Sequence, residues 1–338
     1  MSKHYLSEFD KFPIVDAHVH VHPLLCRELK SIMERTSLAY VVNQGVLELF
    51  DLPFEEGMRE FRESFGDHLI YFTTPDFSDT STGFGERMAK NLEKKILNGA
   101  HGLKIFKELG LRHLDSSRNL IAIDDARLDP LWEKAGELQV PVLIHSADPV
   151  AFFEPLNENN ERWEELQEHP EWHFGGSEFP SHDALLEQRN RVIERHPSTT
   201  FIGAHLGNYP ENLNYVDHCL DRFPNFNVDT SARIGEIGRH PAEDVRAFFL
   251  KHQDRILFGT DLIMGWAENP EDVTVGSTLE EHERFYRRHW QFFETNDPQI
   301  EHPFPIQGQW KVNAIGLPHE VLKKLYFHNA QRIIPGIE

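Results

Sequence analysis

The sequence predicts an α/β protein, a closed (β/α)8 barrel of the TIM type, from three observations. Eight short segments rich in β-branched and aromatic residues alternate with segments of helical periodicity. Several of these strands are almost continuously apolar, as strands covered on both faces must be. The alternation extends over about 250 residues, the usual size of such a barrel. An open doubly wound sheet is the alternative, but no glycine-rich phosphate loop supports it.

Each expected strand is a short apolar run bounded by turn residues. In chain order the strands are Phe12–Ala17, Leu38–Val42, Leu69–Thr73, Gly102–Phe106, Pro141–His145, Thr200–His205, Phe226–Asp229 and Arg255–Thr260. The segments between them repeat apolar residues every three or four positions, which indicates helices. These helices are expected at Pro53–Ser64, Gly85–Leu97, Pro130–Leu138, His182–His196, Glu211–Arg222 and Pro241–His252.

Two long loops interrupt this alternation, one after strand five and one after strand eight. Ala147–Ser181 is too long for an ordinary connection, and its aromatic residues suggest a lid or a pocket wall. The second loop extends from Leu262 to about Glu281 and includes Trp266. A terminal helix is expected at about residues 318–334, closing the bottom or the side of the barrel. Because no repeat or linker is found, residues 1–338 are expected to form one domain.

Composition excludes several classes of function. The 338 residues contain 34 Lys and Arg against 55 Asp and Glu, a net charge of −21, which argues against nucleic acid and anionic membranes as partners. Only Cys26 and Cys219 are present, which rules out a disulfide framework and fits a reducing compartment. Neither a signal peptide nor a membrane span is visible, so a cytoplasmic location is expected. A small molecule is the expected partner, and a homo-oligomer is left open.

The first strand ends in closely spaced histidines. Side chains alternate between the two faces of a strand, so Asp16, His18 and His20 are expected to share the barrel-facing side. The two imidazoles would then point to the barrel mouth, where active sites of this fold lie. An isolated His-x-His is more often a strand cap, so further residues must support a site.

Three other strands supply that support. His145 ends strand five, His205 ends strand six, and Asp261 directly follows strand eight. Taken alone, His145 or His205 would be better explained as a buried histidine with its hydrogen bonds satisfied. Metal-ligating residue types at the ends of four strands, however, favour a common site. Imidazole and carboxylate together are what Zn²⁺, Mn²⁺ or Fe²⁺ use, and three or four ligands with an open position describe a catalytic site.

Two cations are candidates for substrate binding. Lys104 lies on strand four, and its parity leaves open whether it faces the site as ligand or substrate cation or pairs with a carboxylate in the barrel. Arg233, shortly after strand seven, would clamp a substrate carboxylate or else lie on the surface. Lys107, beyond the end of strand four, is expected to be solvated.

The motifs at these strand ends resemble the amidohydrolase superfamily, in the branch that includes aminocarboxymuconate-semialdehyde decarboxylase-like enzymes. The resemblance extends from Val15 to Arg332. It rests on Val15-Asp16-Ala17-His18-Val19-His20, Val142-Leu143-Ile144-His145, Gly203-Ala204-His205-Leu206-Gly207, Phe258-Gly259-Thr260-Asp261 and Asn329-Ala330-Gln331-Arg332.

The resemblance implies that one divalent ion is held by His18, His20, His145 and Asp261, with zinc expected and manganese or iron(II) as alternatives. It also implies that His205 orients or exchanges protons with a water molecule, and some members carry a carboxylated lysine at the position of Lys104. The implied activity is hydrolysis of a small-molecule amide, lactone or ester by metal-activated water, with Asp261 and His205 as catalytic residues. Alternatives are non-oxidative decarboxylation of an unsaturated or aromatic acid, and non-catalytic ligand binding.

Overall fold

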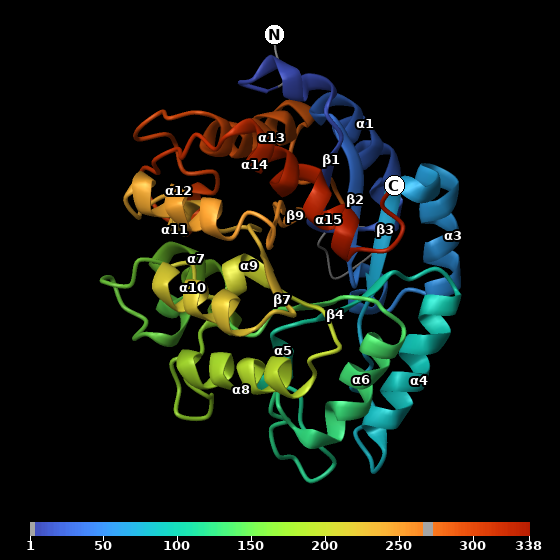
Figure 1. The fold of residues 1–338 in the computed structure, drawn as a ribbon. Helices are drawn as coiled ribbons and strands as arrows, with labels where there is room; N and C mark the ends of the chain where they lie inside the picture. The colour runs from blue at the N-terminus through green and yellow to red at the C-terminus, as the bar shows by residue number, and fades with distance from the viewer. Residues whose placement is uncertain (1–3, 266–272) are drawn as a thin grey trace.

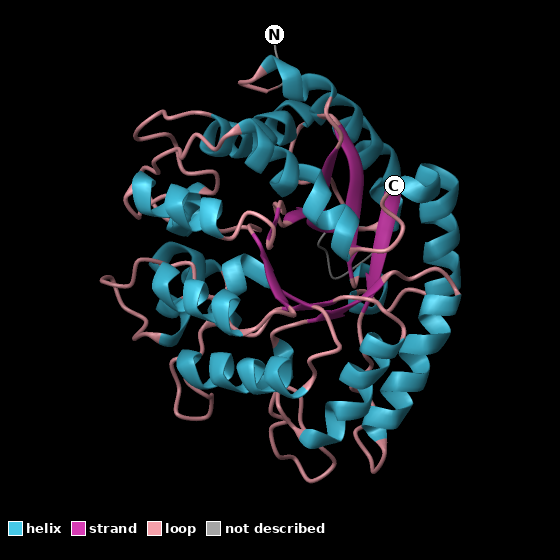
Figure 2. Cartoon of the chain, in the orientation of Figure 1, coloured by secondary structure: helices cyan, strands magenta, loops and turns pink. Residues whose placement is uncertain are grey.

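The sheet of this protein is parallel throughout and contains nine strands within the described residues, 4–265 and 273–338 of a computed structural model. The strand order is β8-β7-β6-β5-β4-β3-β2-β1-β9. Figures 1 and 2 show the strands at the centre and the helices around them. The strands are β1 (Ile14–Val21), β2 (Leu38–Gln44), β3 (Leu69–Thr73), β4 (Gly102–Ile105), β5 (Val142–Ile144), β6 (Phe201–Gly203), β7 (Phe226–Asp229), β8 (Ile256–Leu257) and β9 (Leu262–Met264).

The barrel closes through an eighth strand that is split in two. β8 pairs with β7, whereas β9 pairs with β1. Between the two halves, the Ala17 N–H donates to the carbonyl of Phe258 (2.9 Å) and the Asp261 N–H donates to that of His18 (2.8 Å). The predicted (β/α)8 barrel is therefore confirmed, although its last strand is shorter than expected.

The outer layer contains the six predicted helices, each within two residues of the expected ends. They are α3 (Phe54–Phe65), α4 (Phe84–Leu97), α6 (Asp129–Glu137), α8 (His182–Arg195), α10 (Leu213–Arg222) and α12 (Ala242–Lys251). Among the helices that were not predicted, the two longest are α1 (Cys26–Thr36) and α13 (Leu279–Glu294). α13 begins with a capping box between Thr278 and Glu281, a sequence signal that marks a helix start.

A separate apolar cluster fills the barrel interior below the strand ends. Val15, Val42 and Leu143 from the strands pack there with Phe327 and Ile334 from the C-terminal segment. That segment comprises α14 (His319–Lys323), a π-helical turn (Lys324–His328) and α15 (Asn329–Ile333). The C-terminal segment thus closes the barrel at the end opposite His18 and His20.

β1 contains a β-bulge that changes which side chains face the barrel. Asp16 lies opposite Val41 and Val19 opposite Asn43, so β1 has one residue more than β2 in this interval. The expectation that Asp16 shares a face with the two histidines is therefore wrong. Instead, the Asp16 carboxylate accepts hydrogen bonds from Tyr286 on α13 (Oη to Oδ2, 2.7 Å) and from Thr260 (Oγ1 to Oδ2, 2.5 Å).

The segment 147–181 folds against the barrel in short helical turns, η5 (Val150–Phe153), α7 (Trp163–Glu168) and η6 (Pro170–Trp172). Phe152 and Phe174 are buried in the apolar core. Arg162 is also buried and forms ion pairs with Glu165 and Glu236. Trp266, expected in the second long loop, lies outside the described residues. Within the described part of the chain, no helix is long and apolar enough to cross a membrane.

Candidate metal centre

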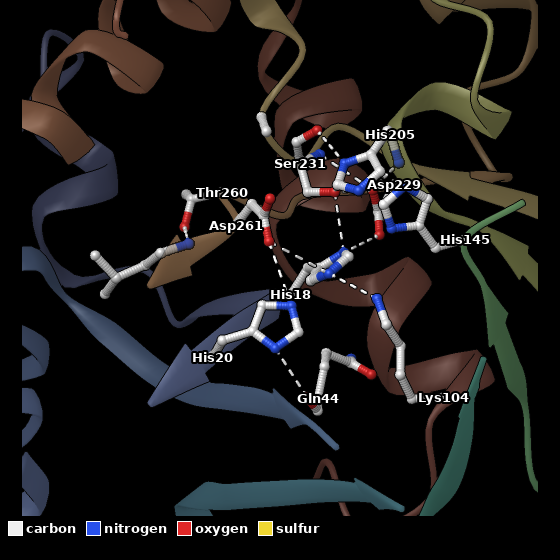
Figure 3. A network of polar contacts seen from close by, with 12 residues as sticks. His18, His20, Gln44, Lys104, His145, His205, Asp229, Ser231, Thr260 and Asp261 are labelled. Atoms are coloured by element: carbon white, nitrogen blue, oxygen red, sulfur yellow. Dashed lines mark hydrogen bonds and ion pairs between the residues drawn. The ribbon is translucent and has the colours of Figure 1, made fainter. Parts of the chain in front are cut away.

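His18, His20 and Asp261 meet at the mouth of the barrel (Figure 3). One ligand atom from each lies within 4.8 Å of the others. Asp261 Oδ1 is 3.5 Å from Nε2 of His18 and 3.4 Å from Nε2 of His20. Asp261 adopts a left-handed conformation (φ 62°) at the break between β8 and β9. The chain thus leaves the strand at the residue whose carboxylate faces the histidines.

Hydrogen bonds determine which nitrogen each histidine presents. Nδ1 of His20 lies 2.8 Å from the carbonyl oxygen of Gln44, which can only accept, so Nδ1 carries the hydrogen. Nδ1 of His18 lies 2.8 Å from Oδ2 of Asp229. Burial alone would raise the pKa of Asp229, but His18 and Ser231 outweigh it and lower the pKa. Asp229 is therefore an ionised acceptor, and both histidines present Nε2 lone pairs towards Asp261.

This donor set fits a divalent cation. Two imidazole nitrogens and a carboxylate oxygen at one point favour a cation there, and nitrogen with carboxylate oxygen is a common ligand set for zinc and manganese. Burial lowers the pKa of His20 well below its ordinary value, and Lys104 lowers it further. His20 is consequently neutral at pH 7, the form that binds metal.

Lys104 lies within this site. Its side chain is fully buried, and its Nζ is 3.0 Å from Nε2 of His18. Burial lowers the pKa of Lys104 to about 8. Lys104 and Leu143 are register partners, and Leu143 belongs to the interior cluster, which settles the direction that the sequence left open.

His145 lies beside the three-residue group but does not belong to it. Its Nε2 is 3.2 Å from Oδ1 of Asp148, and its ring centroid is 4.4 Å from that of His205. Asp148 also forms an ion pair with Lys107, whose Nζ lies 4.9 Å from the centre of the Trp172 ring. The expectation that Lys107 is solvated is therefore wrong: it is held between a carboxylate and an aromatic face.

His205 follows the end of β6 in a left-handed conformation (φ 56°), so the predicted strand ends two residues earlier than expected. Its N–H donates to Oδ1 of Asp229 (2.9 Å), and its Nδ1 lies 3.0 Å from the carbonyl oxygen of Ser231. Because that carbonyl can only accept, Nδ1 carries the hydrogen and Nε2 is an acceptor. Burial lowers the pKa of His205 well below its ordinary value.

Arg233 is buried rather than on the surface, with 6% of its area exposed. Its Nη1 donates to the carbonyl of Ala232 (3.0 Å), and its charge contributes to the lowered pKa of His205 after burial and His145. Arg233 is therefore a cation near the histidine side of the site.

Sequence reasoning missed Asp229 and Asp148, which hold the histidines in place. Asp229 is the last residue of β7 and so lies at the same edge of the sheet as His18. Asp148 follows His145 by three residues in the chain. A search for acids at every strand end, rather than for histidines, would have found Asp229.

The fold is a (β/α)8 barrel, and its mouth contains a candidate metal centre. The family model described as amidohydrolase matches residues 77–336, and the chain belongs to this family. No curated protein matches the sequence at a significant level.

Solved structures share the fold over almost the whole chain. An uncharacterised TIM-barrel protein from Bordetella bronchiseptica has a TM-score of 0.56 at 15% identity, covering 95% of this chain and 98% of its own. A dihydroxybenzoic acid decarboxylase from Polaromonas, with bound manganese and an inhibitor, has a TM-score of 0.56 at 15% identity (95% and 96% covered). A probable 2-pyrone-4,6-dicarboxylic acid hydrolase from Acinetobacter baumannii has a TM-score of 0.52 at 11% identity (95% and 98% covered).

Proposed function

We propose that this protein is a metal-dependent hydrolase that cleaves an amide, lactone or ester bond in a small molecule. The observation that carries the proposal is the convergence of two Nε2 atoms and one carboxylate at the barrel mouth, with both Nδ1 atoms fixed by other groups. His18, His20 and Asp261 would hold one divalent ion. His145 would complete the set through Nδ1, because Asp148 occupies its Nε2.

Zinc is the expected ion, and the manganese of the Polaromonas decarboxylase makes manganese the first alternative. A divalent ion held at this site would lower the pKa of a water molecule to about 7, which makes hydroxide available at neutral pH. The remaining steps belong to side chains of this protein.

Asp261 and His205 are the proposed proton carriers. The Asp261 side chain is 19% exposed and borders a pocket, so it can take a proton from the attacking water and return it to the leaving group. His205 presents Nε2 as an acceptor and would take up a proton during the reaction. Lys104, with a pKa of about 8, remains largely protonated at pH 7 and would stabilise negative charge on a substrate oxygen.

Non-oxidative decarboxylation of an unsaturated or aromatic acid is the second candidate. It is favoured by the two buried cations at the site, Lys104 and Arg233, which could hold a substrate carboxylate. Asp261 or His205 would then deliver the proton to carbon. Both a decarboxylase and a probable hydrolase share this fold.

A product assay tests and separates the two reactions. Metal-loaded protein is incubated with a panel of lactones, amides and esters and with a panel of aromatic acids, while acid release and carbon dioxide are recorded. Hydrolysis predicts acid release without carbon dioxide, and decarboxylation predicts carbon dioxide from the acids. His20→Ala and Asp261→Ala should abolish either activity. Turnover that survives both substitutions would refute catalysis by this site.

A further inference from the structure

A pocket of about 720 Å³ opens beside Asp261 on the side of α13. Asp261 and the start of β9 line one part of it, one face of α13 lines a second, and residues 301–305 line a third. Asp261 is therefore shared by this pocket and by the group that contains the two histidines.

The face of α13 that lines this pocket is distinct from its buried face. Arg284, Phe285 and Arg288 line the pocket. Arg288 follows Arg284 by four residues and Phe285 by three, the spacing that places side chains on one side of a helix. Tyr286 and Trp290 on the other side are buried against the barrel. α13 thus presents two arginines, one turn apart, to the same space as Asp261.

Two acids of the pocket wall interact with these arginines at longer range. Hydrogen bonds from Thr278 lower the pKa of Glu281, and Arg284 lowers it further; Lys311 lowers the pKa of Glu301, and Arg288 lowers it further. Within residues 4–265 and 273–338, neither Arg284 nor Arg288 has a carboxylate within ion-pair distance, and Arg288 Nη1 contacts the neutral Oε1 of Gln291 (3.1 Å). The direct partners of these acids lie elsewhere: Glu281 caps α13 through Thr278, and Glu301 pairs with Lys311. Two guanidinium groups without a direct carboxylate partner among the described residues therefore line this pocket, in a protein with a net charge of −21.

Apolar groups line the same pocket as the arginines and Asp261. The ring of Phe285 meets that of Phe304 at a centroid distance of 5.0 Å, and Ile263 on β9 is 46% exposed. A flat apolar body can rest against such side chains, and a guanidinium pairs well with a carboxylate or a phosphate.

We propose that Arg284 and Arg288 are specificity-determining residues that bind an anionic group of the substrate, remote from the bond that reacts. The apolar part of the substrate lies against Phe285 and Phe304, and the reacting bond lies at Asp261. This inference rests on the proposed function only for the role of Asp261 in the reaction. The pocket and its two arginines are observed independently of that function.

Binding measured by calorimetry on the metal-loaded protein tests the inference without turnover. The probes are isophthalate, phenyl phosphate and the neutral benzamide, so that carboxylate, phosphate and uncharged ligands are compared. We expect saturable binding of at least one anion and none of benzamide in the same range. Arg284→Gln and Arg288→Gln should each weaken anion binding roughly tenfold or more. Arg287→Gln is the matched control, because Arg287 on the same helix lies over the ring of Tyr5 (4.7 Å).

The outcomes separate this inference from the proposed function. Equal anion affinity in all three variants, equal binding of benzamide, or no anion binding at millimolar concentration would overturn the inference. Suppose that Asp261→Ala abolishes turnover while Arg284→Gln and Arg288→Gln keep the wild-type KM and kcat. The proposed function would then stand, and the inference about the arginines would be refuted. If anion binding depends on the arginines but no metal-dependent turnover is found, the inference would stand and the proposed function would be refuted.

Discussion

Asp229 Oδ2 lies 2.8 Å from Nδ1 of His18, at the far side of the ring from Asp261. The same carboxylate accepts the N–H of His205 (2.9 Å) through its other oxygen. One residue at the end of β7 therefore orients a proposed metal ligand from β1 and a proposed proton carrier that follows β6.

Asp229→Asn should weaken metal binding about 10- to 100-fold, the usual effect of losing a group that orients a ligand. Asparagine has one acceptor oxygen where Asp229 uses two, so it cannot accept from both the Nδ1–H of His18 and the N–H of His205. The loss of the negative charge also weakens the hydrogen bond that keeps Nε2 of His18 free for a metal ion. Competition with a chelator measures the affinity. Asp217→Asn is the control, because Asp217 bonds His252 (2.7 Å) at a surface site. Equal affinities in the two variants would contradict the proposed role of Asp229.

Lys104→Met should keep the metal but lower turnover by about 100-fold or more, the usual effect of losing one group that stabilises an oxyanion. Methionine fills the buried space without supplying the charge beside His18. Metal content and kcat are measured together. Loss of the ion along with activity would instead assign Lys104 to the ligands.

His145→Ala should reduce metal affinity less than His20→Ala does. His145 Nε2 is already bonded to Asp148, whereas His20 Nε2 lies 3.4 Å from Asp261. Titration of metal-free variants with zinc gives both affinities. If the two substitutions reduce zinc affinity equally, His145 is a full ligand, and its ring must lie closer to His18, His20 and Asp261 when the metal is bound.

Tyr286→Phe should destabilise the fold by about 1.5–3 kcal/mol, because it removes a hydrogen bond to the buried carboxylate of Asp16 (2.7 Å). Urea unfolding measures the change. Tyr209→Phe is the control, since the Tyr209 hydroxyl has no hydrogen bond to any residue in the described part of the chain, and its substitution should change stability by less than about 0.5 kcal/mol. Similar decreases in the free energy of unfolding in both variants would show that the hydrogen bond from Tyr286 to Asp16 contributes little to stability.

The sequence predicted the barrel because the apolar strands and amphipathic helices each carry their own periodicity. His18, His20 and Asp261 were found because they stand at the ends of strands, where a parallel sheet brings distant residues together. Both inferences depend on local pattern, which a single sequence contains.

Features that depend on register were beyond the sequence. The bulge in β1 turned Asp16 to the outer helices, and no residue type marks it. The direction of Lys104 follows from its pairing with Leu143 on β5. Asp148 is recognised only when its bond to His145 is seen. Each of these is set by contacts between strands or loops rather than by the residues next in the chain.

If His18, His20 and Asp261 hold a divalent ion, metal analysis of the purified protein should detect it. Protein purified without chelator is analysed for metals alongside His20→Ala and Asp261→Ala, with circular dichroism to verify the fold. We expect close to one divalent ion per wild-type chain and only background metal in the folded variants. An ion-free wild-type protein with full activity, or variants that keep their metal, would contradict it.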